Sequence, residues 1–212
     1  ILSLLAATLF AQAETIEHTY HYGQPVVSEH DGYQQIGFQG CLPIGHVGEP
    51  SLPWQSVSLM LPQGQEALSI NVEFLDFVEL EGCFNLYPYQ QPRPVSNEKA
   101  IPFAKNEQLY RSTESYPIRS FSAVSTQYLN GVGFAFSGFT PLRYVPATGK
   151  VGYAQTVKVT IETQACRDDH SRKLWLTPEN EASIKRLAQN ENMIGSYHKR
   201  GREIGGYDML VI

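Results

Sequence analysis

The stretch FTPLRYVPATGKVGYAQTVKVTIET, residues 139–163, decides the fold class. Its PATGK segment, residues 146–150, combines the proline and glycine that favour a tight turn. After this turn Val157, Val159 and Ile161 alternate with polar residues, as in a strand with one buried face. The stretch therefore predicts a β-hairpin.

The same alternation recurs toward the N-terminus. Residues 15–22 and 33–39 each predict a half-buried strand. Residues 57–61 and 67–75, separated by a Pro-Gln-Gly turn, predict a second hairpin. Residues 45–53 contain two glycines and two prolines, which predict an ordered loop rather than a central strand or a helix. With 12 Tyr and 10 Phe in 212 residues, the composition favours an all-β domain.

The regular pattern fades between residues 88 and 117, where Pro, Gln, Asn and Ser predict a long surface loop or a partly ordered excursion. Order returns at residues 118–129 and 131–145. A single helix is then predicted near the C-terminal end, because Thr177 is a good N-cap and Pro178 fits the first helical position. It precedes a linker of glycines and basic residues and the short apolar strand YDMLVI.

The N-terminal residues 1–10 form an apolar run of the length of a signal-peptide core, and AQA at residues 11–13 supplies the small-x-small cleavage pattern. We expect cleavage after Ala13 and export to the cell surface or the medium. The sequence lacks an initiating Met and ends inside a strand, which indicates a piece of a longer precursor. The expected organisation is a signal peptide (1–13), a β-sandwich domain (14–166), a helix with a basic linker (167–206, the linker beginning at Gly195) and the first strand of a further domain (207–212).

Charge and cysteine content narrow the functional class. The net charge of −5 argues against a nucleic-acid partner, since such surfaces concentrate Lys and Arg. No stretch after the signal segment resembles a transmembrane helix. An exported chain with Cys41, Cys83 and Cys166 has room for at most one internal disulfide, and the sequence does not choose among the pairings. We therefore predict no specific disulfide.

Three segments, in this order, resemble the propeptides of gingipain-like cysteine peptidases, peptidase family C25. The first is GEPSLP at residues 48–53, followed by the strand and turn at 57–64. The second is the Tyr-Pro pair at 116–117 with the strand at 131–145, which ends in a Pro-x-x-Tyr-x-Pro pattern. The third is 207–212, which is similar to the opening strand of the caspase-like catalytic domain.

The resemblance implies a β-sandwich propeptide with one C-terminal helix, followed by the start of an α/β caspase-like domain. Such a propeptide covers the active-site cleft of its own catalytic domain, assists its folding or keeps it latent, and is removed by cleavage at basic residues. The catalytic His and Cys of the cysteine endopeptidase would then lie beyond residue 212. The resemblance implies neither a cofactor nor a bound metal.

The residues permit this mechanism independently. An inhibitory segment needs an exposed loop with a side chain suited to the first pocket of the enzyme. Removal needs a flexible bond between domains, and KRGR at 199–202 lies in the glycine-bearing linker. The candidate inhibitory residues are Arg93, Lys99, Lys105 and Arg111. The candidate processing sites are Ala13, at the end of the signal segment, and Arg200 and Arg202 in the linker.

Other functional classes find less support. No His-Gly dipeptide occurs, and Cys166 and His170 flank a polar strand exit, so no catalytic residue is predicted in this segment. His18 and His21, three apart on a strand, face opposite sides of the sheet and predict no metal site. The alternatives are an extracellular β-sandwich that binds a glycan or a protein through its tyrosines, and an adhesion protein whose peptidase-like domain lacks its catalytic pair.

Overall fold

The computed structural model describes residues 14–92, 102–167 and 174–198. These residues are mostly β-strand with a few short helices, which confirms the predicted fold class in its coarse form. The signal segment and the strand expected at 207–212 lie outside the described residues. The elements are β1 (Thr15–His21), β2 (Val26–His30), β3 (Tyr33–Gly37), β4 (Cys41–Ile44), β5 (Leu52–Met60), β6 (Gln65–Glu79), α1 (Glu107–Tyr110), β7 (Ser125–Leu129), β8 (Val132–Phe139), β9 (Leu142–Val145), β10 (Lys150–Ala165), α2 (Pro178–Leu187) and the 3-10 helix η2 (Glu191–Ser196).

The longest strand, β10, organises the first antiparallel sheet. It pairs with β1 on one edge and with β6 on the other, and its first residues also pair with β9. The hairpin predicted from the opening stretch is thereby confirmed as β9–β10. Val157, Val159 and Ile161 are fully buried, because alternate residues of β10 face the core. The alternation in the sequence thus determines which face of this sheet is covered.

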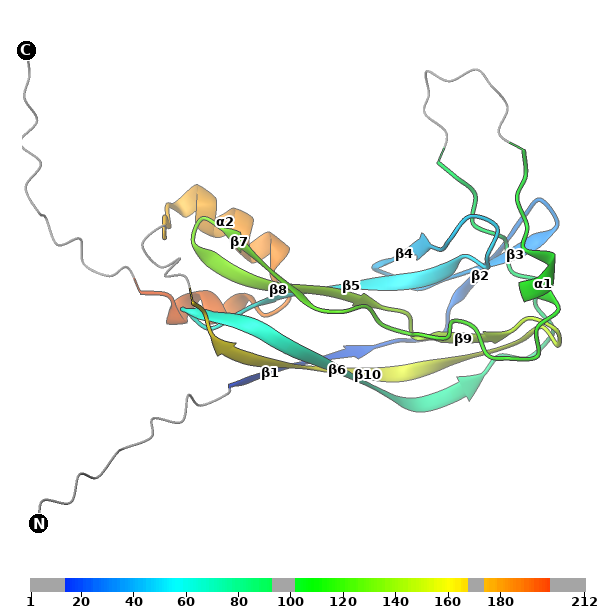
Figure 1. Ribbon diagram of the computed structural model, residues 1–212, viewed down its shortest axis with the longest axis horizontal. Helices are drawn as coiled ribbons and strands as arrows, with labels where there is room; N and C mark the ends of the chain where they lie inside the picture. Colours follow the sequence, from blue (N-terminus) through cyan, green and yellow to red (C-terminus); the bar gives the residue numbers. More distant parts are fainter. Residues whose placement is uncertain (1–13, 93–101, 168–173, 199–212) are drawn as a thin grey trace, which may run out of the picture.

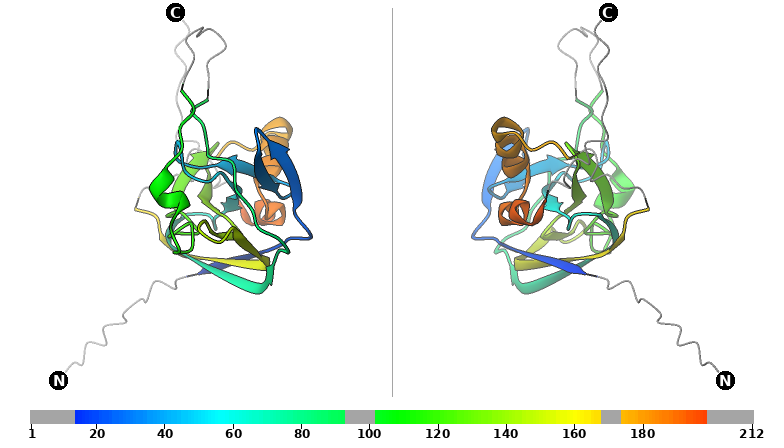
Figure 2. Two further views of the ribbon diagram at one scale, coloured as in Figure 1. Left: turned by 90° about the vertical axis from the view of Figure 1, so that its right-hand side faces the viewer. Right: turned by 90° about the vertical axis from the view of Figure 1, so that its left-hand side faces the viewer.

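The second sheet, with strand order β4-β5-β8-β7, is also antiparallel and lies over the first as a second layer (Figures 1 and 2). Buried side chains of both layers form one hydrophobic core, which includes Phe139 and Leu59 of the second sheet and Ile161 and Ile16 of the first. We call these two layers the two-sheet body. A separate ribbon of β2 and β3 extends from it.

The predicted hairpin of residues 57–61 and 67–75 is wrong. β5 belongs to the second sheet, where it pairs with β4 and β8, whereas β6 pairs with β10 in the first sheet. The turn with Gly64, whose φ is +79°, carries the chain from one layer to the other. Leu59, Met60 and Leu61 are all fully buried, because the end of β5 is covered on both faces. Strand prediction was correct here, but pairing was not.

The predicted loop of residues 45–53 ends earlier than expected, because β5 begins at Leu52. Pro53 lies in β5, where it is opposite Pro43 of β4. β5 pairs with β8 only from Gln55 onward, so Pro53 precedes the part of the strand that has neighbours on both sides. A proline is tolerated at such a place, since no ladder hydrogen bond from its nitrogen is required.

The C-terminal helix α2 begins as predicted and packs on the outer face of the second sheet. The Thr177 hydroxyl accepts a hydrogen bond from the Asn180 backbone N–H, 3.3 Å away. Ile184 is fully buried in a second hydrophobic cluster that includes Met60, Phe134 and Tyr197. The expected start of the linker at Gly195 is wrong, because Gly195 lies in η2.

Helical structure also occurs in the segment that the sequence predicted to be a loop or a partly ordered excursion. The short helix α1 lies in the middle segment, and the Asn106 side chain accepts a hydrogen bond from the Leu109 N–H at 3.1 Å. The sequence did not predict α1, whereas the helix that it predicted after the sheet region is present as α2. None of the helices in that part is both long enough and apolar enough to cross a membrane.

Candidate functional site

The middle segment leaves and re-enters the two-sheet body at one end of the molecule (Figure 1). We define its anchor, residues 85–92 and 102–112, as the loop base. The Gln90 side-chain amide donates to the carbonyl oxygens of Pro88 and Ala104, each at 2.8 Å. Its oxygen accepts from the Ala104 backbone N–H at 2.9 Å. One side chain therefore joins the two arms as a strand partner would.

The GEPSLP motif holds both arms of the loop base. The Gly48 N–H donates to the Tyr89 carbonyl at 2.8 Å, and the Asn106 N–H donates to the Gly48 carbonyl at 2.8 Å. Gly48 has a φ of +86°, and a Cβ atom there would lie 3.3 Å from the Asn106 nitrogen. Glycine is required at this position both for the backbone conformation and for the close approach. The motif that carries the family resemblance is thus an anchor for the middle loop.

Aromatic and charged side chains complete the loop base. The Lys105 ammonium lies 4.7 Å from the ring centroid of Tyr110 and 5.6 Å from that of Tyr33. It also pairs with the Glu107 carboxylate at 3.5 Å. The Phe103 ring packs against Tyr33 at a centroid distance of 5.9 Å. These contacts attach the returning arm to the body.

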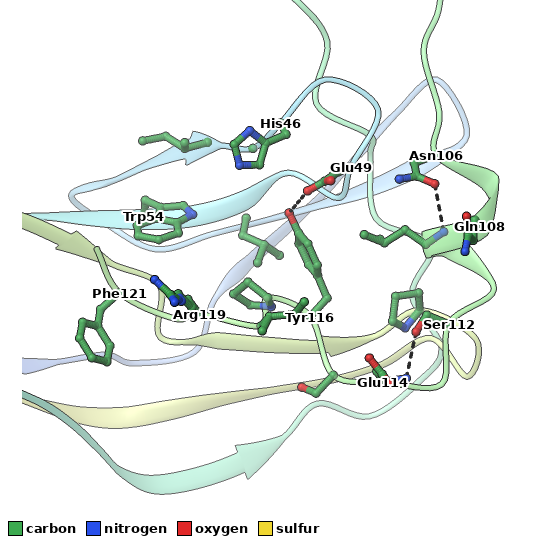
Figure 3. Close-up of a pocket in the computed structure, with 18 of the residues that line it drawn as sticks. His46, Glu49, Trp54, Asn106, Gln108, Ser112, Glu114, Tyr116, Arg119 and Phe121 are labelled. Carbon is green, nitrogen blue, oxygen red and sulfur yellow. Dashed lines mark hydrogen bonds between the residues drawn. The ribbon is translucent and has the colours of Figure 1, made fainter. Parts of the chain in front are cut away.

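A groove of about 1000 Å³ adjoins the loop base (Figure 3). Apolar side chains of β4, β5 and the 115–122 segment line much of it, and Ile118 is 89% exposed there. The Tyr116 hydroxyl donates to the Glu49 carboxylate at 3.1 Å, and burial, with this carboxylate as a further cause, raises the pKa of Tyr116. The lining includes Ile44, His46, Glu49, Leu52, Trp54, Asn106, Leu109, Tyr116, Pro117, Ile118, Arg119 and Phe121.

The predicted inhibitory residues are placed differently from one another. Lys105 is only 23% exposed at its side chain and already has three partners, Tyr110 and Glu107 in the loop base and Tyr33 on β3. Arg111 is exposed at the C-terminal end of α1. Arg93 and Lys99 lie outside the described residues. The predicted processing positions Ala13, Arg200 and Arg202 also lie outside them.

Within the described part of the chain, the cysteines and histidines do not assemble into a recognisable catalytic or metal site. All three cysteines are free thiols, and burial raises the pKa of Cys41 to about 11, which suppresses the nucleophilic thiolate. Cys166 lies 3.2 Å from the Tyr128 hydroxyl, while His170 is outside the described residues. In residues 14–92, 102–167 and 174–198 no group of three His, Cys, Asp or Glu side chains is placed to hold a metal ion.

The sequence did not single out the glutamine that joins the loop arms. Gln90 lies in a polar segment, and its partner Ala104 is 14 residues away. No periodic pattern marks a side chain that substitutes for a strand. The signals that pointed to this part of the molecule were the proline and glycine pattern of residues 48–53, the Tyr-Pro pair at 116–117 and the loss of periodicity between residues 88 and 117.

Comparisons with known proteins identify the family. The model of the C25 propeptide family, Propeptide_C25, matches residues 18–182. A solved structure described as a complex of Porphyromonas gingivalis RgpB pro- and mature domains is similar with a TM-score of 0.62 at 20% identity, covering 86% of this chain and 96% of that chain.

A second solved structure, described as giving structural insight into the zymogenic latency of gingipain K from Porphyromonas gingivalis, has a TM-score of 0.58 at 18% identity. It covers 78% of this chain and 98% of that chain. No curated protein matches the sequence. The family match begins within β1, includes all the later strands of the two-sheet body and reaches into α2. The chain therefore belongs to the propeptide family of the C25 peptidases, the gingipains.

Proposed function

We propose that this chain is the propeptide of a secreted gingipain-like cysteine endopeptidase, that it keeps the enzyme latent and assists its folding, and that it is removed by cleavage at basic residues. The observation that carries the proposal is the loop base. An inhibitory loop must be exposed at its tip and fixed at its root, because ordering a free loop on binding would weaken inhibition. Gln90, Gly48 and Lys105 supply that fixed root.

The two-sheet body provides two separate points of attachment to the enzyme. The loop base lies at one end, and α2 with η2 lies at the other (Figure 1). Strand β10, 16 residues long, extends along the body and is about 50 Å in length. We propose that the propeptide lies across the catalytic domain, with the middle loop at the active-site cleft and the covalent connection at the opposite end.

The groove beside the loop base is the surface we assign to the enzyme. Its apolar side chains, such as Ile118 and Phe121, are exposed in the described part of the chain, and Arg119 and Glu49 add charges of both signs. An apolar patch with polar residues around it is typical of a protein interface. Because Asn106 and Leu109 belong to both the groove and the loop base, one docked surface would cover both.

Among the candidate inhibitory residues, the proposal favours those of the loop over those of its base. Lys105 is held by Tyr110, Tyr33 and Glu107, and these contacts would be lost if it entered an enzyme pocket. Arg93 and Lys99 are therefore the preferred candidates for the residue that blocks the active site.

The test is inhibition in trans. The purified chain is titrated against the mature enzyme encoded by the same precursor, and an inhibition constant is measured for the wild type, Arg93→Ala and Lys99→Ala. Loss of inhibition by one variant identifies the blocking residue. Lys158→Ala serves as a control, because Lys158 lies midway along β10, where it pairs with the Glu17 carboxylate, and belongs to neither proposed point of attachment. Binding without inhibition would support the alternative of an extracellular binding module, and absence of binding would contradict both.

A further inference from the structure

The free edge of β5 is covered by two side chains that follow α2. β4 pairs with β5 only up to Gln55, so the outward backbone groups of the rest of β5 lack a strand. The Gln189 amide donates to the Ser56 carbonyl at 2.8 Å, and its oxygen accepts from the Ser58 N–H at 2.9 Å. Asn190 makes the same two-way contact with Met60, at 2.7 and 3.0 Å. We call residues 189–198 the strap, since they close this edge.

The strap is bonded to the two-sheet body and to Gln63 as far as His198, its last described residue. The Tyr197 side chain is 7% exposed, and its hydroxyl donates to the Leu61 carbonyl at 2.6 Å and accepts from the Gly133 N–H at 3.1 Å. The Gln63 side chain then binds both backbone groups of His198. Its amide donates to the His198 carbonyl, and its oxygen accepts from the His198 N–H, each at 2.9 Å.

This attachment conflicts with cleavage immediately after Arg200. Endopeptidases bind a substrate as an extended strand and pair with backbone groups of residues that precede the cleaved bond. For the bond after Arg200, the third residue back is His198 and the fourth is Tyr197. The N–H and carbonyl of His198 are the groups that the protease needs, and both are already bonded to Gln63.

For the bond after Arg202, the same four positions are residues 199–202, all of which come after His198 in the sequence. We propose that the strap directs processing to the Arg202–Glu203 bond and protects the Arg200–Gly201 bond. Hydrolysis adds one water, leaving a carboxylate on Arg202 and an amino group on Glu203. The inference rests on the proposed function for the purpose of this cleavage, since a propeptide must be released from its enzyme.

The test uses trypsin as a probe on the full 212-residue chain. Mass spectrometry measures the initial rates at which the C-terminal fragments 203–212 and 201–212 appear. A synthetic peptide of residues 195–212, which lacks the two-sheet body, gives the preference of trypsin for the local sequence alone. We expect the rate ratio of Arg202 to Arg200 to be about tenfold higher in the chain than in the peptide, because cleavage after Arg200 requires local opening of the strap.

Two variants separate the strap from other causes. Gln63→Ala removes both bonds to His198, and Tyr197→Phe removes the hydroxyl bonds while keeping the ring. Each should lower the ratio toward that of the peptide, with folding checked by circular dichroism. Gln127→Ala on the exposed side of β7 is the matched control and should leave the ratio unchanged. Equal ratios in chain and peptide, or no effect of either variant, would overturn the inference.

Because trypsin replaces the natural protease, this result does not depend on the latency assay. Inhibition in trans can fail while the strap still protects Arg200, and the reverse outcome is equally distinguishable. Replacement of Arg202 in the complete precursor then extends the test. Arg202→Gln should block maturation more strongly than Arg200→Gln, and the opposite order would contradict the assignment.

Discussion

At each end of the body, a glutamine side chain binds the N–H and the carbonyl of one distant residue, but the two contacts have different roles. At the loop base, Gln90 binds the N–H and the carbonyl of Ala104. At the strap end, Gln63 binds the N–H and the carbonyl of His198. In both places a glutamine side chain binds a backbone N–H and carbonyl as a neighbouring strand would.

The surroundings of the two glutamines differ. The loop base is half-exposed and fixed by backbone hydrogen bonds and a cation–π cluster. The strap is fixed by burial of Tyr197, and α2, which precedes it, is fixed by burial of Ile184. Buried apolar area generally stabilises a fold more than exposed polar contacts do. The strap end therefore contributes mainly to the stability of the domain, whereas the loop base contributes mainly to holding the middle loop in position.

The largest expected effect is the loss of folding stability when the contacts of the strap end are removed. Tyr197→Ala removes a buried ring and two hydrogen bonds, and should lower the free energy of unfolding by about 3–4 kcal/mol. The matched variant at the other end, Phe103→Ala, removes a ring that is 52% exposed and should cost less than about 1 kcal/mol. Urea unfolding of both variants measures the difference. Similar losses would refute the assignment of stability to the strap end.

The next largest effect tests whether the Gly48 contact in the loop base is required for inhibition. Gly48→Ala places a Cβ atom 3.3 Å from the Asn106 nitrogen in a backbone conformation with φ at +86°, and should cost about 2 kcal/mol. Inhibition of the enzyme should weaken with it, because the returning arm is displaced. Gly32→Ala is the control, since Gly32 has a φ of +79° but nothing within 4 Å of its added Cβ. If Gly32→Ala weakens inhibition equally, strain rather than contact with Asn106 is responsible.

A smaller effect distinguishes the two glutamines. Gln90→Ala should raise the inhibition constant about fivefold, because the Ala104 backbone groups lose their partner, and should leave tryptic cleavage at Arg200 unchanged. Gln63→Ala should do the opposite. Inhibition assays and fragment analysis on the same two proteins provide the measurement. Each variant serves as the control for the other, and a parallel change in both assays would show that the ends are not independent.

The sequence predicted what depends on local periodicity and missed what depends on distant side chains. The burial of Val157 and Ile161 followed from alternation, and Thr177 marked the start of α2. The pairing of β5 was not predictable, because consecutive buried residues leave the neighbouring strand unspecified. Gln63 and His198 are 135 residues apart, and no local pattern joins them.

The smallest expected effect is a response of the strap end to acid. His18 lies on β1 beside Tyr20, with ring centroids 4.7 Å apart, and burial lowers the pKa of His18 from its ordinary value of 6.5. The Tyr20 hydroxyl donates to Gln189 of the strap at 2.6 Å. Because the folded pKa lies below the unfolded one, the stability from neutral His18 is fully present above about pH 6.5 and is lost as the pH falls below it.

Two measurements connect this loss to the strap rather than to acid in general. The free energy of unfolding should decline less between about pH 7.5 and about pH 5.5 in His18→Gln than in the wild type. This range brackets the ordinary histidine pKa of about 6.5. Hydrogen-exchange protection should fall more at the Ser58 amide, which donates to Gln189, than at the Asn106 amide, which donates to Gly48. An equal fall at both amides would mean that acid loosens the whole body, and the two ends would then share one stability.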